Sequence, residues 1–181
     1  MAMTADHIRA TLAAYLDACP EDKERLACLS ALLDDSAADL TSRKEFRGHV
    51  TAGTVLADPA DRVLHIHHLA LGRWLLPGGH LEPGDTSLPA AALRELTEET
   101  GIPGSAVVPV GRRPVHIDVH TIPASPAKGE PEHPHFDFRF LFRTSADVGK
   151  LQTEEVTDAA WRPADAIEDE HLRARVLVAL R

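Results

Sequence analysis

The residues best suited to chemistry in this chain are Glu95, Glu98 and Glu99, which follow a glycine-rich segment that begins at Gly78. Their spacing of i, i+3 and i+4 places them on one face of a helix. Like charges packed in this way repel one another, and they weaken an isolated helix. A hard divalent cation between them removes that repulsion, because Mg²⁺ and Mn²⁺ prefer carboxylate oxygens. The pattern therefore predicts a Mg²⁺ or Mn²⁺ site, and the alternative is a solvated acidic helix face.

The helix that carries these glutamates has recognisable ends. Asp85, Thr86 and Ser87 are each competent N-caps, and Pro89 suits the first turn of a helix. Gly101 is placed to end the helix in a left-handed turn. We therefore expect a short capped helix directly after the glycine-rich segment.

Residues 78–102 resemble the Nudix box of the Nudix hydrolases. In that motif a glycine, a spacer, an acidic residue and a second spacer precede the pattern Arg-Glu-aliphatic-x-Glu-Glu-x-Gly-aliphatic. Residues 94–102 match this second half at every defined position. The first half departs in two ways, because Asp85 stands where the family usually has Glu and the spacer from Asp85 to Arg94 is one residue longer. The resemblance implies an α/β fold, a Nudix-like α/β/α sandwich with a mixed sheet.

The resemblance also implies a reaction and a set of metal ligands. The reaction is metal-dependent hydrolysis of the pyrophosphate bond in a nucleoside diphosphate linked to another moiety. The implied ligands of Mg²⁺ or Mn²⁺ are Glu95, Glu98, Glu99 and the backbone carbonyl of Gly78. Arg94 is expected to orient the glutamates through charge-assisted bonds, with Glu98 as its partner four residues on.

The general base has two candidate sources, because Nudix enzymes differ on this point. One is a glutamate of the box, Glu95 or Glu98. The other is an acidic residue in the loop before the last strand, where Glu155 and Glu154 stand side by side. We favour Glu155 as the base or as an additional metal ligand, against the alternative of a solvated loop acid.

A second group of polar residues lies on two predicted strands, residues 115–122 and 134–143. The two-residue period of a strand places His116, Asp118 and His120 on one face of the first strand. In the second strand the same period places His135, Asp137 and Arg139 on one face, together with the preceding His133. The phenylalanines of this strand occupy the other face.

This polar face has two candidate functions. It could line the substrate pocket, where an arginine and imidazoles would bond phosphate or sugar oxygens. Some of the imidazoles could instead bind a transition metal, since His-x-Asp-x-His places ligands on one face. We favour the pocket, and the predicted substrate-binding residues are Arg139, His135, Asp137, His120 and Asp118.

The predicted elements fall into two segments, an N-terminal helical segment over residues 1–45 and a Nudix hydrolase domain over residues 46–181. Residues 5–18 and 21–33 have the apolar spacing of helices and are expected to form a hairpin that serves in packing, as a lid or as a dimer contact. The second segment begins with strands and ends with helices. Its expected strands span residues 49–57, 62–68, 71–76, 106–110, 115–122, 134–143 and 159–162, with a polar loop over residues 153–158, a helix starting at Pro163 and another over residues 172–180.

Composition narrows the function classes. The chain has 181 residues, 44 % hydrophobic and 26 % charged, which is typical of a soluble globular protein. Its net charge of −9 argues against a nucleic-acid polymer as partner, but not against a small nucleotide whose phosphates are neutralised by bound cations. The chain has no apolar run of membrane-spanning length and no recognisable secretion signal, and its only cysteines, Cys19 and Cys28, lack metal-ligand neighbours. We therefore expect a cytoplasmic protein without a membrane partner, and the resemblance favours a homodimer.

The identity of the nucleotide is left open by the sequence. Tyr15 is the only tyrosine and lies upstream of the box, so the downstream tyrosine expected of diadenosine polyphosphate hydrolases is missing. A nucleotide sugar, ADP-ribose and a nucleoside triphosphate all remain candidates. The alternative from another class is a non-catalytic nucleotide sensor with the same fold, although the acidic N-terminal segment does not resemble a DNA-binding module.

Overall fold

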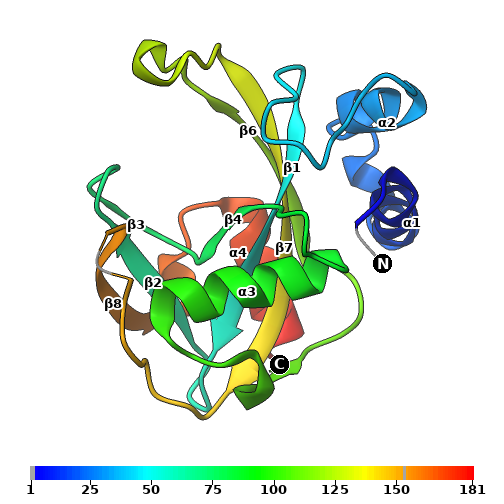
Figure 1. The fold of residues 1–181 in the computed structure, drawn as a ribbon. Helices are drawn as coiled ribbons and strands as arrows, with labels where there is room; N and C mark the ends of the chain where they lie inside the picture. The colour runs from blue at the N-terminus through cyan, green and yellow to red at the C-terminus, as the bar shows by residue number, and fades with distance from the viewer. Residues whose placement is uncertain (1–2, 153) are drawn as a thin grey trace. The chain divides into compact units, whose positions relative to one another are not determined.

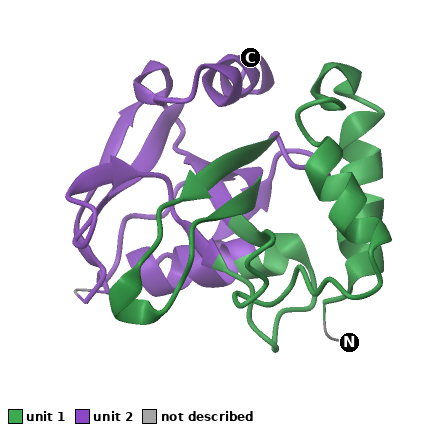
Figure 2. Cartoon of the chain, turned by 90° about the horizontal axis from the view of Figure 1, so that it is seen from above, with its two compact units in different colours: residues 1–52, 80–91, 117–138 green, residues 53–79, 92–116, 139–181 purple. Residues whose placement is uncertain are grey.

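The computed structural model describes residues 3–152 and 154–181, and the chain divides into two compact units (Figure 2). Unit 1 comprises the chain up to residue 52 together with residues 80–91 and 117–138. Unit 2 comprises residues 53–79, 92–116 and 139–181. The predicted boundary after residue 45 stays a prediction.

Unit 1 contains the N-terminal helices α1 (Ala5–Leu16) and α2 (Ala27–Asp34), with the short 3-10 helix η1 (Pro20–Asp22) between them (Figure 1). Thr4 caps α1, because its side chain accepts from the backbone N–H of His7. The Tyr15 hydroxyl donates to the carboxylate of Asp22, and both side chains are buried. The prediction of one helix over residues 21–33 is therefore wrong at its start, where turns hold Asp22 against Tyr15 before α2 begins.

The N-terminal helices are attached to the rest of unit 1 by specific bonds. The backbone N–H of Met3 donates to the carbonyl of Asp85 at 3.0 Å. The Arg25 guanidinium donates to the carbonyl of Ile117 at 2.6 Å. The expected roles of this segment were packing, a lid or a dimer contact, and these bonds support packing.

The described residues form an eight-stranded sheet with the main order β3-β2-β1-β7-β5. Strand β4 pairs with β1, β6 with β7, and β8 with β2, and the last of these pairs is antiparallel. The strands are β1 (His49–Ala57), β2 (Arg62–His68), β3 (Arg73–Leu75), β4 (Gly78–His80), β5 (Val107–Pro109), β6 (His116–Ile122), β7 (His133–Thr144) and β8 (Val156–Pro163).

Two further sequence-based boundaries are wrong, and one strand was not predicted. The predicted polar loop over residues 153–158 is too long, because β8 starts at Val156 and pairs along all of β2; residue 153 lies outside the described residues. The helix predicted to start at Pro163 is only the 3-10 turn η4 (Ala164–Ala166), since the backbone is extended again at Ile167. The glycine-rich loop contains the short strand β4, which periodicity could not indicate.

In unit 2 the core lies between the sheet and α4 (Glu170–Ala179) (Figure 1). Leu172 and Val176 of α4 pack with buried side chains from three strands, namely Val55 of β1, Val63 of β2 and Leu141 of β7. The other long helix is α3 (Leu88–Thr100), whose Ala92 and Leu96 are fully buried. No helix within residues 3–152 and 154–181 is long and apolar enough to cross a bilayer.

Candidate active site

Helix α3 has the ends that its sequence predicts. The Ser87 hydroxyl accepts from the backbone N–H of Ala90 at 3.2 Å, so Ser87 is the residue that caps the helix. Gly101 has a left-handed φ of 70° and its N–H donates to the carbonyl of Thr97 at 2.9 Å. A Cβ at Gly101 would lie 2.6 Å from the backbone nitrogen of Lys150, so glycine is also needed for close packing.

Glu99 is the most buried carboxylate of α3, with 4 % of its surface exposed. Its Oε2 accepts from the backbone N–H of Gly78 at 3.0 Å, which attaches the glycine-rich strand to the helix. Burial raises the pKa of Glu99 to about 8, and the neighbouring Glu95 adds to the rise, while the bond from Gly78 opposes it. A buried carboxylate with a raised pKa is poorly stabilised as an anion, so it readily binds either a proton or a cation.

Glu95 lies beside the second glycine of β4. An ideal Cβ at Gly79 would approach Glu95 Oε1 to 2.6 Å, so only glycine leaves room for this carboxylate. Burial raises the pKa of Glu95 to about 6, and Arg94 acts in the opposite direction. The glycine-rich segment therefore contacts two of the three glutamates.

Glu98 is the most open of the three glutamates, with 47 % of its side chain exposed. Arg94 Nη1 donates to Glu98 Oε2 at 3.1 Å and to Glu95 Oε1 at 2.9 Å. The prediction that Arg94 pairs with Glu98 is confirmed, and the same guanidinium also holds Glu95. This bridge holds the carboxylates of Glu95 and Glu98 close to one guanidinium.

Two further charged residues of unit 2 act on this cluster. The negative charge of Glu155 contributes to the raised pKa of both Glu95 and Glu99. The positive charge of Arg139 acts on Glu99 in the opposite direction. Arg139 Nη1 donates to the carbonyl of Pro77 at 2.9 Å, so this arginine also supports the segment that leads into β4.

Asp85, the acidic residue that departs from the motif, belongs to unit 1 and is 5 % exposed. Its Oδ2 accepts from the backbone N–H of Glu82 at 2.7 Å, and its own N–H donates back to the carbonyl of Glu82 at 2.9 Å. These bonds close the turn before α3.

The donor set on α3 suits a hard divalent cation. It consists of carboxylate oxygens, two of them on largely buried side chains whose pKa values are raised mainly by burial. Mg²⁺ and Mn²⁺ favour such oxygen ligands, and a cation bound here would lower both pKa values.

The predicted polar face of β6 and β7 does not form one uniform surface. In unit 1, Asp118 and His120 form a partly exposed pair at 2.9 Å. His135 and Asp137 are instead buried, at 8 % and 3 % exposure, and Asp137 accepts from the hydroxyl of Thr51 at 3.1 Å. In unit 2 the His116 ring lies 2.9 Å from the guanidinium nitrogen Nη1 of Arg175, so His116 serves in packing against α4.

Sequence reasoning missed two members of a histidine cluster in unit 1. The rings of His49 and His135 lie 4.4 Å apart, and His80 lies 5.1 Å from His135. Burial lowers the pKa of His49, of His80 to about 4 and of His135 to about 2, with the neighbouring imidazoles adding to each shift. The signal was faint, because His49 and His80 are isolated in sequence and only the sheet brings them beside β7.

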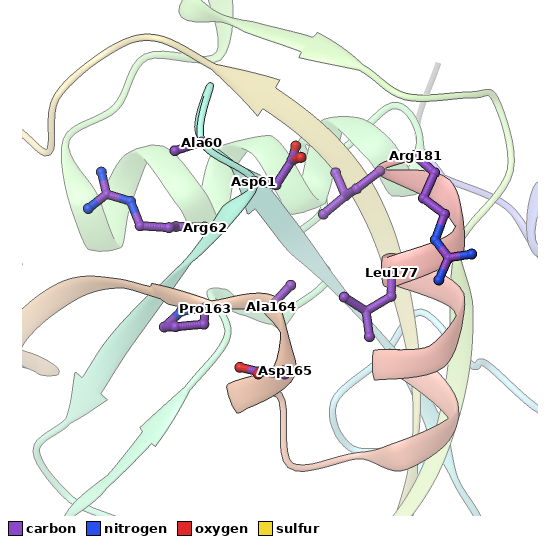
Figure 3. Close-up of a pocket in the computed structure, with 9 residues that line it drawn as sticks. Ala60, Asp61, Arg62, Pro163, Ala164, Asp165, Leu177 and Arg181 are labelled. Atoms are coloured by element: carbon purple, nitrogen blue, oxygen red, sulfur yellow. The ribbon is translucent and has the colours of Figure 1, made fainter.

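The cavity in Figure 3 lies elsewhere in unit 2, between the β1–β2 turn, the end of β8 and α4, and has a volume of about 430 Å³. None of the predicted site residues lines it. We therefore do not assign the catalytic chemistry to this cavity, whose lining residues are Ala60, Asp61, Arg62, Pro163, Ala164, Asp165, Leu177, Leu180 and Arg181.

Comparison with known proteins identifies the family of the chain. The sequence model of the NUDIX domain matches residues 47–180. A probable DHNTP pyrophosphohydrolase of Lactococcus lactis is 29 % identical over 136 residues, which cover 72 % of this chain and 75 % of the relative. A putative mutator protein MutT4 of Mycobacterium tuberculosis is 37 % identical over 101 residues, which cover 50 % of this chain but only 32 % of that protein.

Solved structures show the same fold. The Ap4A hydrolase of C. elegans, solved as a binary complex, superimposes with a TM-score of 0.55 at 22 % identity. The match covers 72 % of this chain and 96 % of the hydrolase. The predicted α/β class and fold are therefore confirmed.

Proposed function

Because the chain belongs to the Nudix hydrolase family, we propose that it is a metal-dependent pyrophosphohydrolase whose catalytic centre is the glutamate face of α3. The observation that supports this most is the pair Glu95 and Glu99, held on one face by Gly78 and Gly79 with raised pKa values. A merely solvated acidic face would need neither this burial nor the contacts with β4.

In this proposal Glu95, Glu98, Glu99 and the carbonyl of Gly78 hold Mg²⁺ or Mn²⁺. The cation supplies neutralisation of the phosphate charge and acidification of a water molecule. Arg94 keeps Glu95 and Glu98 in place through its two bonds. Protein groups otherwise contribute positioning and electrostatics, as in other phosphoryl transfers.

Glu155 is our candidate for the general base, in the loop before β8. Its carbonyl accepts from the backbone N–H of Leu69 at 2.8 Å, which ties this loop to the end of β2. The carboxylate would accept a proton from the water that attacks phosphorus, while the bridging P–O bond breaks and the leaving phosphate departs with that oxygen. The electrostatic effect of Glu155 on Glu95 and Glu99 supports this role.

The proposed substrates are nucleoside diphosphates linked to another moiety, including nucleoside triphosphates, nucleotide sugars and ADP-ribose. DHNTP joins this set because of the name of the Lactococcus lactis relative. Arg139, whose positive charge acts on Glu99, is our candidate for the phosphates. Contact of the partly exposed Asp118 and His120 with other polar groups of the substrate stays a prediction. Contact of His135 and Asp137 with substrate stays a prediction, as does the homodimer.

A hydrolysis screen tests the proposal. The full chain is incubated with these substrates in the presence of Mg²⁺, Mn²⁺ or a chelator. Formation of the nucleoside monophosphate and of its co-product, pyrophosphate or a phosphate monoester, is measured by chromatography. We expect turnover only with a divalent cation and a loss of about 10²-fold or more in kcat for Glu98→Gln. Binding of a nucleotide without cleavage, in a folded sample with either cation, would instead support the sensor alternative.

The role of Glu155 is tested by Glu155→Gln, with Glu154→Gln as the matched control in the same loop. We expect kcat to fall by about 10²–10⁴ in the first variant, because a general base contributes that much, and to stay near the original value in the second. Equal activity of both variants would transfer the base role to a glutamate of α3.

A further inference from the structure

Three imidazoles of unit 1 meet in a buried cluster that no proposed step of the hydrolysis uses. His49 is the first residue of β1, while His133 and His135 share one face of β7, the neighbouring strand in the sheet. One ring nitrogen of each lies within 4.8 Å of the other two. All three side chains are buried, at 1 %, 4 % and 8 % exposure.

Hydrogen bonds determine which ring nitrogen of His49 and of His133 is free to bind a metal. His49 Nδ1 lies 3.2 Å from the carbonyl of Glu45, and His133 Nδ1 lies 2.7 Å from the carbonyl of Pro131. A carbonyl only accepts, so each Nδ1 carries the hydrogen and each Nε2 carries a lone pair. Metal-binding histidines usually donate from their other nitrogen in this way, which orients the ring.

The free nitrogens are buried. Among the residues that the structure describes, Nε2 of His49 and Nε2 of His135 have no hydrogen-bond partner. Buried polar atoms are normally satisfied, so two orphan nitrogens in one cluster point to a ligand that the chain itself does not supply. The phenyl ring of Phe46 stands edge-on to His133 at 5.3 Å and adds an apolar contact.

We propose that unit 1 binds one divalent transition-metal ion of the zinc class through His49, His133 and His135. Imidazole nitrogens suit Zn²⁺ and Co²⁺, whereas Mg²⁺ prefers the carboxylate oxygens of α3. In tetrahedral zinc the ligand nitrogens are about 3.3 Å apart, given Zn–N distances of about 2.05 Å, so the nitrogens need to approach one another by at most about 1.5 Å on binding. The fourth ligand is a water molecule or His80, whose ring lies 5.2 Å from that of His49.

This metal site does not depend on the proposed hydrolysis. It would join the start of β1 to β7, and it would stabilise the folded chain because the unfolded chain has no such arrangement of ligands. It also gives buried His135 a role other than direct contact with substrate.

Zinc titration in the presence of excess Mg²⁺ tests the proposal on the full chain without a histidine tag, after chelator treatment and desalting. We expect one Zn²⁺ per chain by calorimetry, a rise in Tm, and a Co²⁺ absorption spectrum typical of a low-coordinate site. His133→Asn and His135→Asn should each weaken zinc binding by at least about tenfold. His171→Asn, which changes an exposed histidine of α4, is the matched control and should bind zinc as the original chain does.

Imidazole NMR on the unaltered chain keeps the test independent of whether a variant folds. Zinc should shift the Nε2 resonances of His49 and His133 and leave those of His171 in place. Unchanged resonances at saturating zinc would overturn the proposal. So would zinc binding that survives His133→Asn and His135→Asn, or that is lost in Glu98→Gln, because the ion would then belong to α3.

Discussion

At the scale of single residues, the proposed chemistry of this chain depends on carboxylates that are held where they are poorly solvated. Glu99 is almost fully buried and accepts one backbone hydrogen bond, while Glu95 lies against Gly79. Ionisation of either carboxyl group without a counter-charge destabilises the folded state, and this energetic cost favours cation binding. Arg94 offsets part of it by bridging Glu95 and Glu98.

Glu99→Gln should stabilise the metal-free protein at alkaline pH. The folded pKa of Glu99 is raised to about 8, above the ordinary value of 4.5, so its carboxyl favours folding while protonated and this contribution is lost as pH rises through about 8. The glutamine keeps an acceptor for Gly78 but cannot ionise. We expect a gain of a few kcal/mol at pH 9 in chelator, measured by denaturant unfolding.

The same variant supplies the control. At pH 4, where the carboxyl is protonated in both states, the two proteins should have nearly equal stability. Addition of Mg²⁺ at pH 8 should raise the Tm of the original chain and leave that of Glu99→Gln almost unchanged. A variant that is less stable at every pH would contradict this account of Glu99.

At the scale of elements, a short strand and a capped helix create the site together. Strand β4 has room for the carboxylate of Glu95 because Gly79 has no side chain. Helix α3 begins at Leu88 after the cap at Ser87, which fixes the phase of its glutamate face.

Gly79→Ala tests the contact between β4 and α3. The new methyl would lie 2.6 Å from Glu95 Oε1 and should displace this carboxylate, which lowers kcat by about tenfold or more and weakens Mg²⁺ binding. Gly84→Ala is the matched control, because a Cβ there has no atom within 4 Å and the residue has no left-handed φ. Kinetics and calorimetry on both variants measure the difference, and equal losses would contradict a local effect at Glu95.

Tyr15→Phe tests the role of the N-terminal helices in packing. The change removes the bond to Asp22 while Asp22 keeps its ion pair with Arg25 at 2.9 Å. We expect a loss of about 1 kcal/mol in the free energy of unfolding, since one buried hydrogen bond is removed. The kcat should be unaffected, and a large fall in kcat at full folding would instead indicate that this segment acts as a lid.

At the scale of the whole molecule, two groups of titrating residues act on stability in opposite directions. Unit 2 contributes Glu95 and Glu99, whose raised pKa values destabilise the metal-free fold as pH rises above about 4.5. Unit 1 contributes His49 and His135, whose lowered pKa values require neutral rings in the folded state. Their stabilising contribution is present above pH 6.5 and is lost as pH falls toward the folded pKa.

The metal-free protein should therefore be most stable near pH 6, with a decline on both sides. Mg²⁺ should remove the alkaline decline only, because its proposed ligands are the carboxylates of α3. A set of Tm measurements from pH 4 to pH 9, with and without Mg²⁺, checks this. If Mg²⁺ raised the Tm equally at acidic and at alkaline pH, the result would contradict the assignment of the two declines to separate groups of residues.

The sequence by itself determined the stop of α3 at Gly101, the strands β1, β2 and β7, the glutamate face and the pairing of Arg94 with Glu98, and it narrowed the N-cap of α3 to three residues. These features depend on residues close in sequence, where periodicity and capping act directly. The helix predicted at Pro163 and the late start predicted for the last strand were wrong, because β8 follows its partner β2 rather than its own polar pattern. The local sequence pattern does not indicate that β8 pairs with β2.

Tertiary structure alone decided how solvated each side chain is. It buried Glu99 while leaving Glu98 half open, and it brought His49 beside His133 and His135 although they are more than eighty residues apart in the chain. Solvation and long-range proximity depend on which strands pair and which helix covers them. Solvation and proximity determine the pKa of a carboxyl group and which nitrogen of an imidazole is free to bind a metal. Residue type alone determines neither.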